Sequence, residues 1–124
     1  MQLYVLDELY AIVRLEHDAD FPPWCRGGHF WSVTRSDSEL SVVCRQDDVP
    51  QDASAERGFV AFEVAGPLDF SLTGVVASLA MPFADEGIPV FFLSTFETDY
   101  LLVREHDLHR SVEALTNAGH SVDG

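Results

Sequence analysis

Between Phe59 and Arg104, apolar residues change their spacing in a way that predicts a strand, a helix and two more strands. Phe59–Val64 is apolar and β-prone apart from Glu63, which is typical of a strand buried on most of its surface. Gly66-Pro67 ends this run, as such dipeptides usually do. Apolar residues then recur three and four positions apart, as on one face of a helix: Leu72, Val75, Val76, Leu79 and Phe83.

Polar residues and glycines indicate where this helix begins and ends. Ser71 is the predicted N-cap, and Asp69 lies close enough to favour the positive end of the helix dipole. Gly87 is the predicted C-cap residue, because glycine adopts the left-handed conformation at little cost. The helix should therefore start near Leu72 and stop just before Gly87.

Two further strands and a second helix follow. Ile88–Leu93 and Tyr100–Val103 predict strands, and the polar segment Ser94–Asp99 predicts a turn between them. A second helix should begin near Glu105 or His106 and stop at Gly119, with Leu108, Val112 and Leu115 at helical spacing. The resulting order β-α-β-β-α is most of a ferredoxin-like unit, an α+β fold.

The first half of the chain predicts strands but little helix. Its apolar segments are Leu3–Leu6, Tyr10–Leu15, Phe30–Thr34 and Leu40–Cys44. We expect a turn at the polar pair Asp7-Glu8 and a loop over Gln46–Arg57, which is the best boundary between the halves. Because only His120–Val122 follows the second helix, a strand from the first half should fill the place of a last strand. That strand would also protect a sheet edge.

The charge balance limits the classes of partner. The 124 residues include seven arginines, no lysine and 21 acidic residues, for a formal net charge of −14. This field repels nucleic acids and anionic membranes and favours cationic or zwitterionic partners. Genome composition or a salty cytoplasm is the favoured explanation of this charge. The absence of lysine excludes Schiff-base chemistry and a lysine-bearing phosphate loop.

No metal, cofactor or catalytic motif is predicted. His106 and His109 lie three apart and can meet on one helical face, but the spacing favours a solvated first turn over a zinc site. Cys25 and Cys44 form no CxxC pair and are expected to be free thiols in a reducing cytosol. Ser71, Ser94 and His29 form no recognisable catalytic arrangement. No signal peptide or membrane-spanning stretch is visible, so we expect a cytoplasmic protein. We expect it to be non-enzymatic, because no nucleophile, base or cofactor motif stands out.

The second half carries a family resemblance. The run GPLDFSLTGVVASLAMPFADEGIPVFFLSTFETDYLLVREHDLHRSVEALTNAGHSV resembles the ACT-domain family. The similarity is to small bacterial ACT-like proteins related to aspartate kinase regulatory domains and to animal cytosolic arginine sensors. It implies a tandem of two ACT-like units with antiparallel sheets and helices on one face. A degenerate unit would cover residues 1–57 and a complete one residues 58–124.

The resemblance also implies a ligand site. In the arginine-sensing relatives a threonine-phenylalanine pair and an aspartate of the hairpin help to hold the ligand, and these match Thr95, Phe96 and Asp99. The helix start at Leu72, Thr73 and Gly74 would receive the ligand carboxylate, because the first N–H groups of a helix lack partners. Alternatively, Gly74 only permits close helix packing, and Thr98 and Asp99 only stabilise the turn.

Two functions follow as expectations. The first is a non-enzymatic regulatory protein that binds a small amino acid or related metabolite and alters contact with a partner protein. The second is a ligand-free interaction module that pairs through sheet edges. A homodimer is expected, because ACT-type units usually associate through their sheets. The site would lie between the halves, lie between two copies, or be lost.

Overall fold

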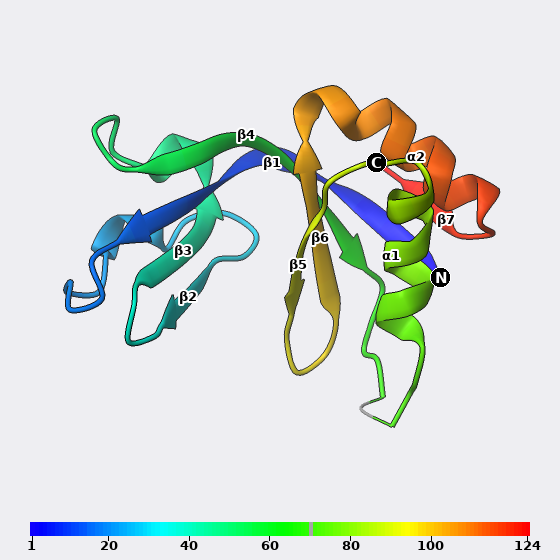
Figure 1. Ribbon diagram of the computed structural model, residues 1–124, viewed down its shortest axis with the longest axis horizontal. Coiled ribbons are helices and arrows are strands. Elements are labelled where there is room, and N and C mark those ends of the chain that lie inside the picture. Colours follow the sequence, from blue (N-terminus) through cyan, green and yellow to red (C-terminus); the bar gives the residue numbers. More distant parts are fainter. Residues whose placement is uncertain (70) are drawn as a thin grey trace. The chain divides into compact units, whose positions relative to one another are not determined.

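The computed structural model describes residues 1–69 and 71–124 and contains two compact units (Figure 1). The larger unit combines Met1–Asp7 with Val60–Gly124, and the smaller unit is Glu8–Phe59. Two strands, β1 (Gln2–Leu15) and β4 (Ala55–Val64), contribute residues to both units. Each unit is therefore built from a different part of the same two strands.

The larger unit contains the helices and the hairpin that the second half of the sequence predicts, namely α1 (Val75–Asp85), β5 (Phe91–Ser94), β6 (Asp99–Arg104) and α2 (Leu108–Asn117), with a 3₁₀ turn at Glu105–Asp107 before α2. It also contains a short last strand that the sequence did not predict, β7 (Ser121–Asp123). Its strand order is β7-β1-β4-β6-β5. β5 and β6 form the predicted antiparallel hairpin, in which Ser94 pairs with Asp99. β7 pairs with β1 in parallel, so the expectation of purely antiparallel sheets is wrong at this edge.

The core of the larger unit lies between one face of its sheet and the two helices. Alternate strand residues point into it: Leu3, Phe62, Val64, Leu101 and Val103. They pack against Leu79 and Phe83 of α1 and Leu115 of α2. Both helices therefore cover the same face, as expected for this α+β fold (Figure 1). Side chains at the intervening strand positions point to the opposite face.

The smaller unit contains β2 (Ser32–Arg35) and β3 (Leu40–Arg45), in the order β2-β3-β1 with β4 following. Two 3₁₀ turns, Pro23–Cys25 and Gln46–Asp48, complete it, and among its residues, all of which are described, none is α-helical. Both cysteines are buried free thiols, as predicted. Burial raises the pKa of Cys44 to about 12. That this unit is a degenerate ACT-like unit stays a prediction.

Two local predictions in the first half are wrong. Asp7-Glu8 is not a turn, because β1 continues through it. Glu8 Oε2 accepts a hydrogen bond from Arg45 Nη1 of β3 at 3.1 Å, so the Glu8 carboxylate has a positively charged partner within the sheet. The predicted loop over Gln46–Arg57 is a loop only in part, since β4 begins at Ala55.

The start of α1 also differs from the prediction. Ser71 is not the N-cap: its N–H and its hydroxyl both donate to Asp69 Oδ1 at 2.8 Å, which makes a local turn. The helix begins three residues later than predicted, with Gly74 as N-cap at φ 76°. Its other end is as predicted, since Gly87 has φ 66° and Ile88 N–H bonds back to Phe83 O at 2.9 Å.

The last strand of the larger unit is short, and β1 from the first half lies between it and β4. A strand of the first half thus occupies the place that we expected it to fill. None of the helices in the described parts of the chain has the length and apolarity needed to cross a membrane.

Candidate functional site

A pocket of about 220 Å³ lies between the segment that leads into α1 and the β5–β6 hairpin, all within the larger unit. Leu68, Asp69, Leu72, Val75 and Val76 line one side of it. The other side consists of the hairpin residues 94–99. The pocket thus combines an apolar wall with a polar turn.

Hydrogen bonds hold the turn in one conformation. Thr95 N–H donates to Thr98 O at 2.8 Å, and Thr98 N–H donates to Thr95 Oγ1 at 3.2 Å. The Thr98 hydroxyl donates to Val64 O at 2.5 Å, which ties the turn to β4. Leu68 N–H donates to Glu97 O at 2.6 Å, which ties the α1 side of the pocket to the turn. Both sides are therefore positioned by backbone contacts before any ligand arrives.

Asp99 is the buried carboxylate of this pocket. Its side chain accepts a hydrogen bond from Ser94 Oγ at 2.6 Å, and the residue is only 7% exposed. A carboxylate kept at the edge of an apolar wall attracts an ammonium or guanidinium donor, because a charge-assisted hydrogen bond is stronger than a neutral one. Asp99 is thus suited to the cationic end of a zwitterionic ligand.

The start of α1 carries partial positive charge, opposite in sign to the Asp99 carboxylate. The N–H groups of its first turn lack intrahelical partners and carry partial positive charge. Gly74, directly before Val75, has no side chain, and nothing lies within 4 Å of where a Cβ would be. Nearby, the two hydrogen bonds from Ser71 hold the pKa of Asp69 below its usual range, so this carboxylate stays charged. A ligand carboxylate must therefore approach the helix start away from Asp69.

The structure brings four of the six predicted ligand residues to the pocket. Leu72, Thr95, Phe96 and Asp99 line it, whereas Thr73 and Gly74 do not. Ser94 also lines the pocket, and the sequence prediction missed it. Ser94 pairs with Asp99 across the hairpin, so it could have been predicted as a pocket residue once the turn had been located.

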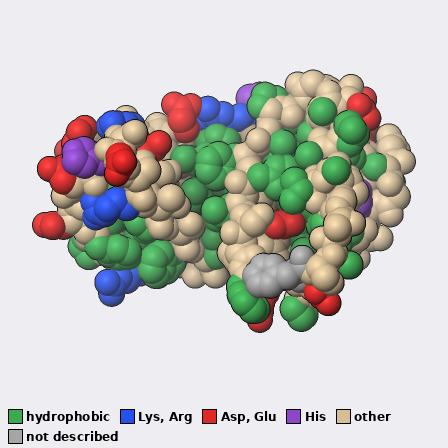
Figure 2. Space-filling model, turned by 60° about the horizontal axis from the view of Figure 1, so that its bottom comes forward, with side chains coloured by type: hydrophobic (Ala, Val, Ile, Leu, Met, Phe, Trp, Pro, Cys, Tyr) green, Lys and Arg blue, Asp and Glu red, His purple; other side chains and the backbone are tan. Residues whose placement is uncertain are grey.

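The rim of the pocket is unusually apolar for an exposed surface. Leu72 is 53% exposed, Val76 50% and Phe96 76%. The sequence predicted Leu72 and Val76 as part of the buried helix face, and the structure places them at the surface instead. Figure 2, which brings the lower part of Figure 1 forward, shows apolar side chains at the surface around this end of the unit. Such exposed groups commonly mark a contact surface.

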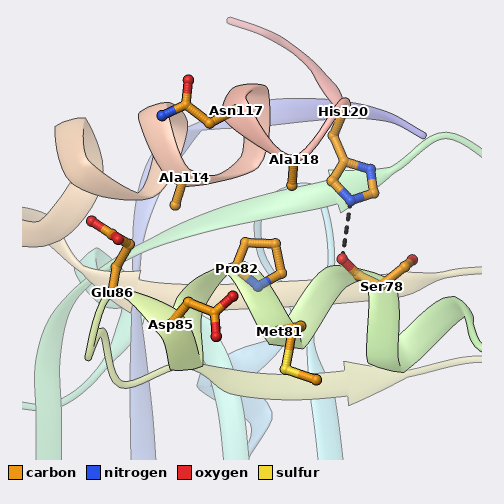
Figure 3. Close-up of a pocket in the computed structure, with 9 residues that line it drawn as sticks. All are labelled: Ser78, Met81, Pro82, Asp85, Glu86, Ala114, Asn117, Ala118 and His120. Atoms are coloured by element: carbon orange, nitrogen blue, oxygen red, sulfur yellow. Dashed lines mark hydrogen bonds between the residues drawn. The ribbon is translucent and has the colours of Figure 1, made fainter.

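A larger groove, of about 470 Å³, lies between α1 and α2 (Figure 3). Pro82 of α1 lies opposite Ala114 of α2 and Ala118, the C-cap residue of that helix. His120 Nε2 lies 3.1 Å from Ser78 O across the groove. It contains none of the predicted ligand residues. Its carboxylates, Asp85 and Glu86, belong to exposed residues, so it lacks the buried carboxylate of the hairpin pocket.

The two histidines of the α2 region make ordinary surface contacts. His106 Nε2 lies 3.5 Å from Asp107 Oδ2, and His109 Nε2 lies 3.4 Å from Glu113 Oε1. Both imidazoles are largely exposed. Among residues 1–69 and 71–124, no group of three or more His, Cys, Asp or Glu side chains is arranged to hold a metal ion.

Comparison with known families identifies the class of protein. The model of the ACT domain matches residues 54–117, more than half of the chain, so the chain belongs to the ACT domain family. A second family model, for an N-terminal domain, matches residues 8–52, which fall within the smaller unit.

Individual relatives extend this result. The crystal structure of protein Atu0741 from Agobacterium tumefaciens is 44% identical, covers 98% of this chain and 90% of its own, and superposes with a TM-score of 0.92. The regulatory subunit of aspartate kinase from Thermus thermophilus is 10% identical, with a TM-score of 0.61 over 92% of this chain and 94% of its own, which shows a shared fold. The human protein CASTOR3P is 30% identical over 92 residues, or 64% of this chain. The match spans 56% of that relative's length.

Proposed function

We propose that this protein is a non-enzymatic regulator that binds a small amino acid or a related metabolite in the hairpin pocket. The buried, hydrogen-bonded carboxylate of Asp99 is the observation that carries the proposal. The volume of about 220 Å³ is below the roughly 300–1,000 Å³ of typical ligand pockets, which favours a small ligand. ACT family membership and the fold shared with an aspartate kinase regulatory subunit support a regulatory, ligand-binding role.

The ligand lies across the pocket in this proposal. Its ammonium or basic side chain faces Asp99, and Thr95 and the Phe96 backbone add polar contacts. Its carboxylate faces the first turn of α1, at the end of the segment Leu72–Gly74. Glu97 adds negative charge to the turn, so a zwitterion or a cationic amino acid is preferred over a dicarboxylate.

Binding regulates by changing a protein contact. A ligand that bridges the hairpin and the start of α1 holds the two sides of the pocket together. A partner protein responds only if it prefers one of the two states, because coupling between sites requires a difference in affinity. The exposed rim of Leu72, Val76 and Phe96 supports a partner surface here, either on another protein or on a second copy in a homodimer.

A thermal-shift screen of the whole chain against the twenty amino acids tests this proposal, with nucleotides as controls. Ligand at about one hundred times its dissociation constant adds roughly 2.7 kcal/mol to the free energy of unfolding. We expect one chemical class of amino acid to raise Tm by several degrees and the nucleotides to leave it unchanged. The absence of a shift with every amino acid would contradict the proposal.

A specific observation supports the alternative of a ligand-free interaction module. β5 is the last strand in the order of the larger unit, and Phe91, Phe92 and Leu93 are only partly buried. An exposed edge strand is a template for pairing with another chain. A dimer by light scattering that becomes a monomer on Phe91→Lys, together with no response to amino acids, would favour this function.

A further inference from the structure

The groove between α1 and α2, which lies within the larger unit, is held open at both ends. At one end, Arg110 Nη2 of α2 donates to the backbone oxygen of Glu86, the C-cap residue of α1, at 2.6 Å. At the other end, His120 Nε2 lies 3.1 Å from the backbone oxygen of Ser78 (Figure 3). These two contacts fix the separation of the helices, so the groove of about 470 Å³ exists before any partner arrives.

The side chains along the middle of the groove are apolar and mostly small. Pro82 of α1 lies opposite Ala114 and Ala118, so little bulk rises from the floor (Figure 3). Met81 lines the α1 side and is 59% exposed. An exposed methionine adapts its shape to a partner, and exposed apolar groups around a depression commonly mark a contact surface. The groove therefore offers an apolar seat to a second molecule.

Two carboxylates beside this seat lie where a helix favours the opposite charge. Asp85 is the last residue of α1 and Glu86 is its C-cap, and the last turn contains no basic residue. Both residues line the groove and are exposed, and within the described chain no hydrogen bond or ion pair engages either carboxylate. A cation is stabilising near a helix C-terminus because the free carbonyls there carry partial negative charge.

The positive groups of the larger unit are engaged elsewhere. Arg110, which contacts the Glu86 backbone, directs its other amino group to Asp107 Oδ1 at 3.3 Å. The Met1 ammonium lies 2.9 Å from Nδ1 of His120, at the end of the groove away from Glu86 (Figure 3). The larger unit has eleven acidic residues and two arginines, so its field attracts a cationic partner.

The geometry favours a helix as the occupant. Ser78, Met81, Pro82 and Asp85 recur at three- and four-residue spacing along one side of α1. An extended segment laid on this apolar surface would leave backbone N–H and C=O groups without partners, because those of α1 and α2 are used within the helices. A helix satisfies its own backbone groups and presents only side chains to the groove.

The occupant should come from another protein rather than from a second copy of this chain. The chain contains no lysine, and the α-helices of its described part contain one arginine, Arg110, which is already bound. A second copy therefore has no free helical cation to place beside Asp85 and Glu86.

We propose that the groove between α1 and α2 docks an amphipathic helix of another protein, with a lysine or arginine at the edge of its apolar face. The apolar face lies on Met81 and Pro82, and the cation faces Asp85 and Glu86. This surface does not depend on the amino-acid site, because the groove and the hairpin pocket share no lining residue.

Two synthetic peptides test the proposal on the full chain. Each is about fifteen residues long, because shorter helices are marginal in water. Both carry leucine and alanine along one helical face; one has lysines beside this face, and the other has glutamates at the same positions. We expect the lysine peptide to bind saturably in fluorescence anisotropy and to shift the NMR amide signals of α1 and α2. No binding, or equal binding of the glutamate peptide, would overturn the proposal.

Matched variants separate docking in the groove from general attraction to an acidic protein. Asp85→Asn together with Glu86→Gln should weaken binding of the lysine peptide roughly fivefold, since exposed ion pairs contribute modestly. Glu105→Gln together with Glu113→Gln removes two exposed charges of the same unit outside the groove. This control should weaken binding less than about twofold, because salt screens distant charges. Equal weakening by the two pairs would mean that only net charge attracts the peptide, and the proposal would be wrong.

A steric variant locates the bound peptide. Ala118→Trp adds bulk to the groove at an exposed position and should weaken binding more than about tenfold through a clash, while an unchanged Tm shows that the fold is intact. Asp99→Asn should leave peptide binding unchanged, so this surface and the amino-acid site can fail independently. If Ala118→Trp binds the peptide normally, the peptide lies elsewhere and the proposal is wrong. If the wild type is a dimer that Ala118→Trp separates, a second copy covers the groove and the assigned occupant is wrong.

Discussion

Asp99→Asn should remove most of the stabilisation that an amino-acid ligand provides while leaving the fold almost unchanged. The asparagine amide keeps the size of the side chain, and its oxygen can still accept the hydrogen bond that Ser94 Oγ donates at 2.6 Å. Only the negative charge is lost. The cost to the free energy of unfolding should therefore stay below about 1 kcal/mol, the typical size of one neutral hydrogen bond.

The effect on binding is larger. A hydrogen bond to a charged group contributes about 1.5–3 kcal/mol, so its loss raises the dissociation constant roughly 10- to 150-fold. Ligand at one hundred times the wild-type dissociation constant adds about 2.7 kcal/mol to the free energy of unfolding of the wild type. At the same ligand concentration, a variant with a dissociation constant one hundred times higher gains only about 0.4 kcal/mol. For a domain of this size the rise in Tm falls from about 10 °C to below about 2 °C.

The assay is a thermal shift of both proteins with the amino acid that the screen identifies. Asp107→Asn is the matched control, because Asp107 is equally buried in the same unit but contacts Arg110 and does not line the hairpin pocket. It should keep the full ligand-induced shift. If Asp99→Asn also keeps it, the ligand does not face Asp99 and the assigned orientation is wrong.

Three further predictions concern the fold around the site. Phe83→Ala should lower the free energy of unfolding, measured with denaturant, by about 3–5 kcal/mol, because the side chain is fully buried. Met81→Ala, on the exposed side of the same helix, should lower it little. Equal losses in the two variants would contradict the assigned core. Gly66→Ala should loosen the hairpin, since a Cβ there would lie 2.9 Å from Glu97 O; unchanged amide exchange at the pocket would refute this. Burial raises the pKa of Cys44 from 9.0 to about 12, so the folded thiol keeps its proton where the unfolded one loses it, and stability should fall as pH rises from about 9 towards 12. Cys44→Ala should remove that part of the pH dependence, and an identical pH profile in this variant would show that the thiol does not contribute.

The hairpin that carries one side of the candidate site was predictable from local sequence, whereas the start of α1 on the other side was not. The assignment of Thr95, Phe96 and Asp99 to a ligand site came from the family resemblance and stays a prediction. The apolar run Tyr100–Val103 and the polar turn before it place Thr95 and Asp99 in the hairpin, because hairpin register follows from the turn. The predicted start of α1 was wrong because the Ser71 side chain has two possible hydrogen-bond partners. As an N-cap it would bond the helix, but with Asp69 two residues earlier it bonds that carboxylate instead. Periodicity alone does not distinguish these outcomes.

The sequence analysis also ended the first strand too early. Asp7-Glu8 has the polarity of a turn, and local rules assign it as one. β1 runs through this pair, and Arg45, far away in the sequence, supplies a partner for Glu8. The place of β1 beside β4 was predictable in outline, because the segment after the second helix is short. The parallel pairing of β1 with β7 depends on tertiary contacts that no local pattern encodes.

The pairing of Gln2–Tyr4 with Ser121–Asp123 has a consequence for the order of events during synthesis. The smaller unit is one continuous segment, so it can fold while the ribosome is still making the rest. The larger unit cannot close until the residues of β7 have emerged. Until then, the first residues of β1 present a strand without this partner, and a nascent chain in that state is open to pairing with its neighbours on the same messenger.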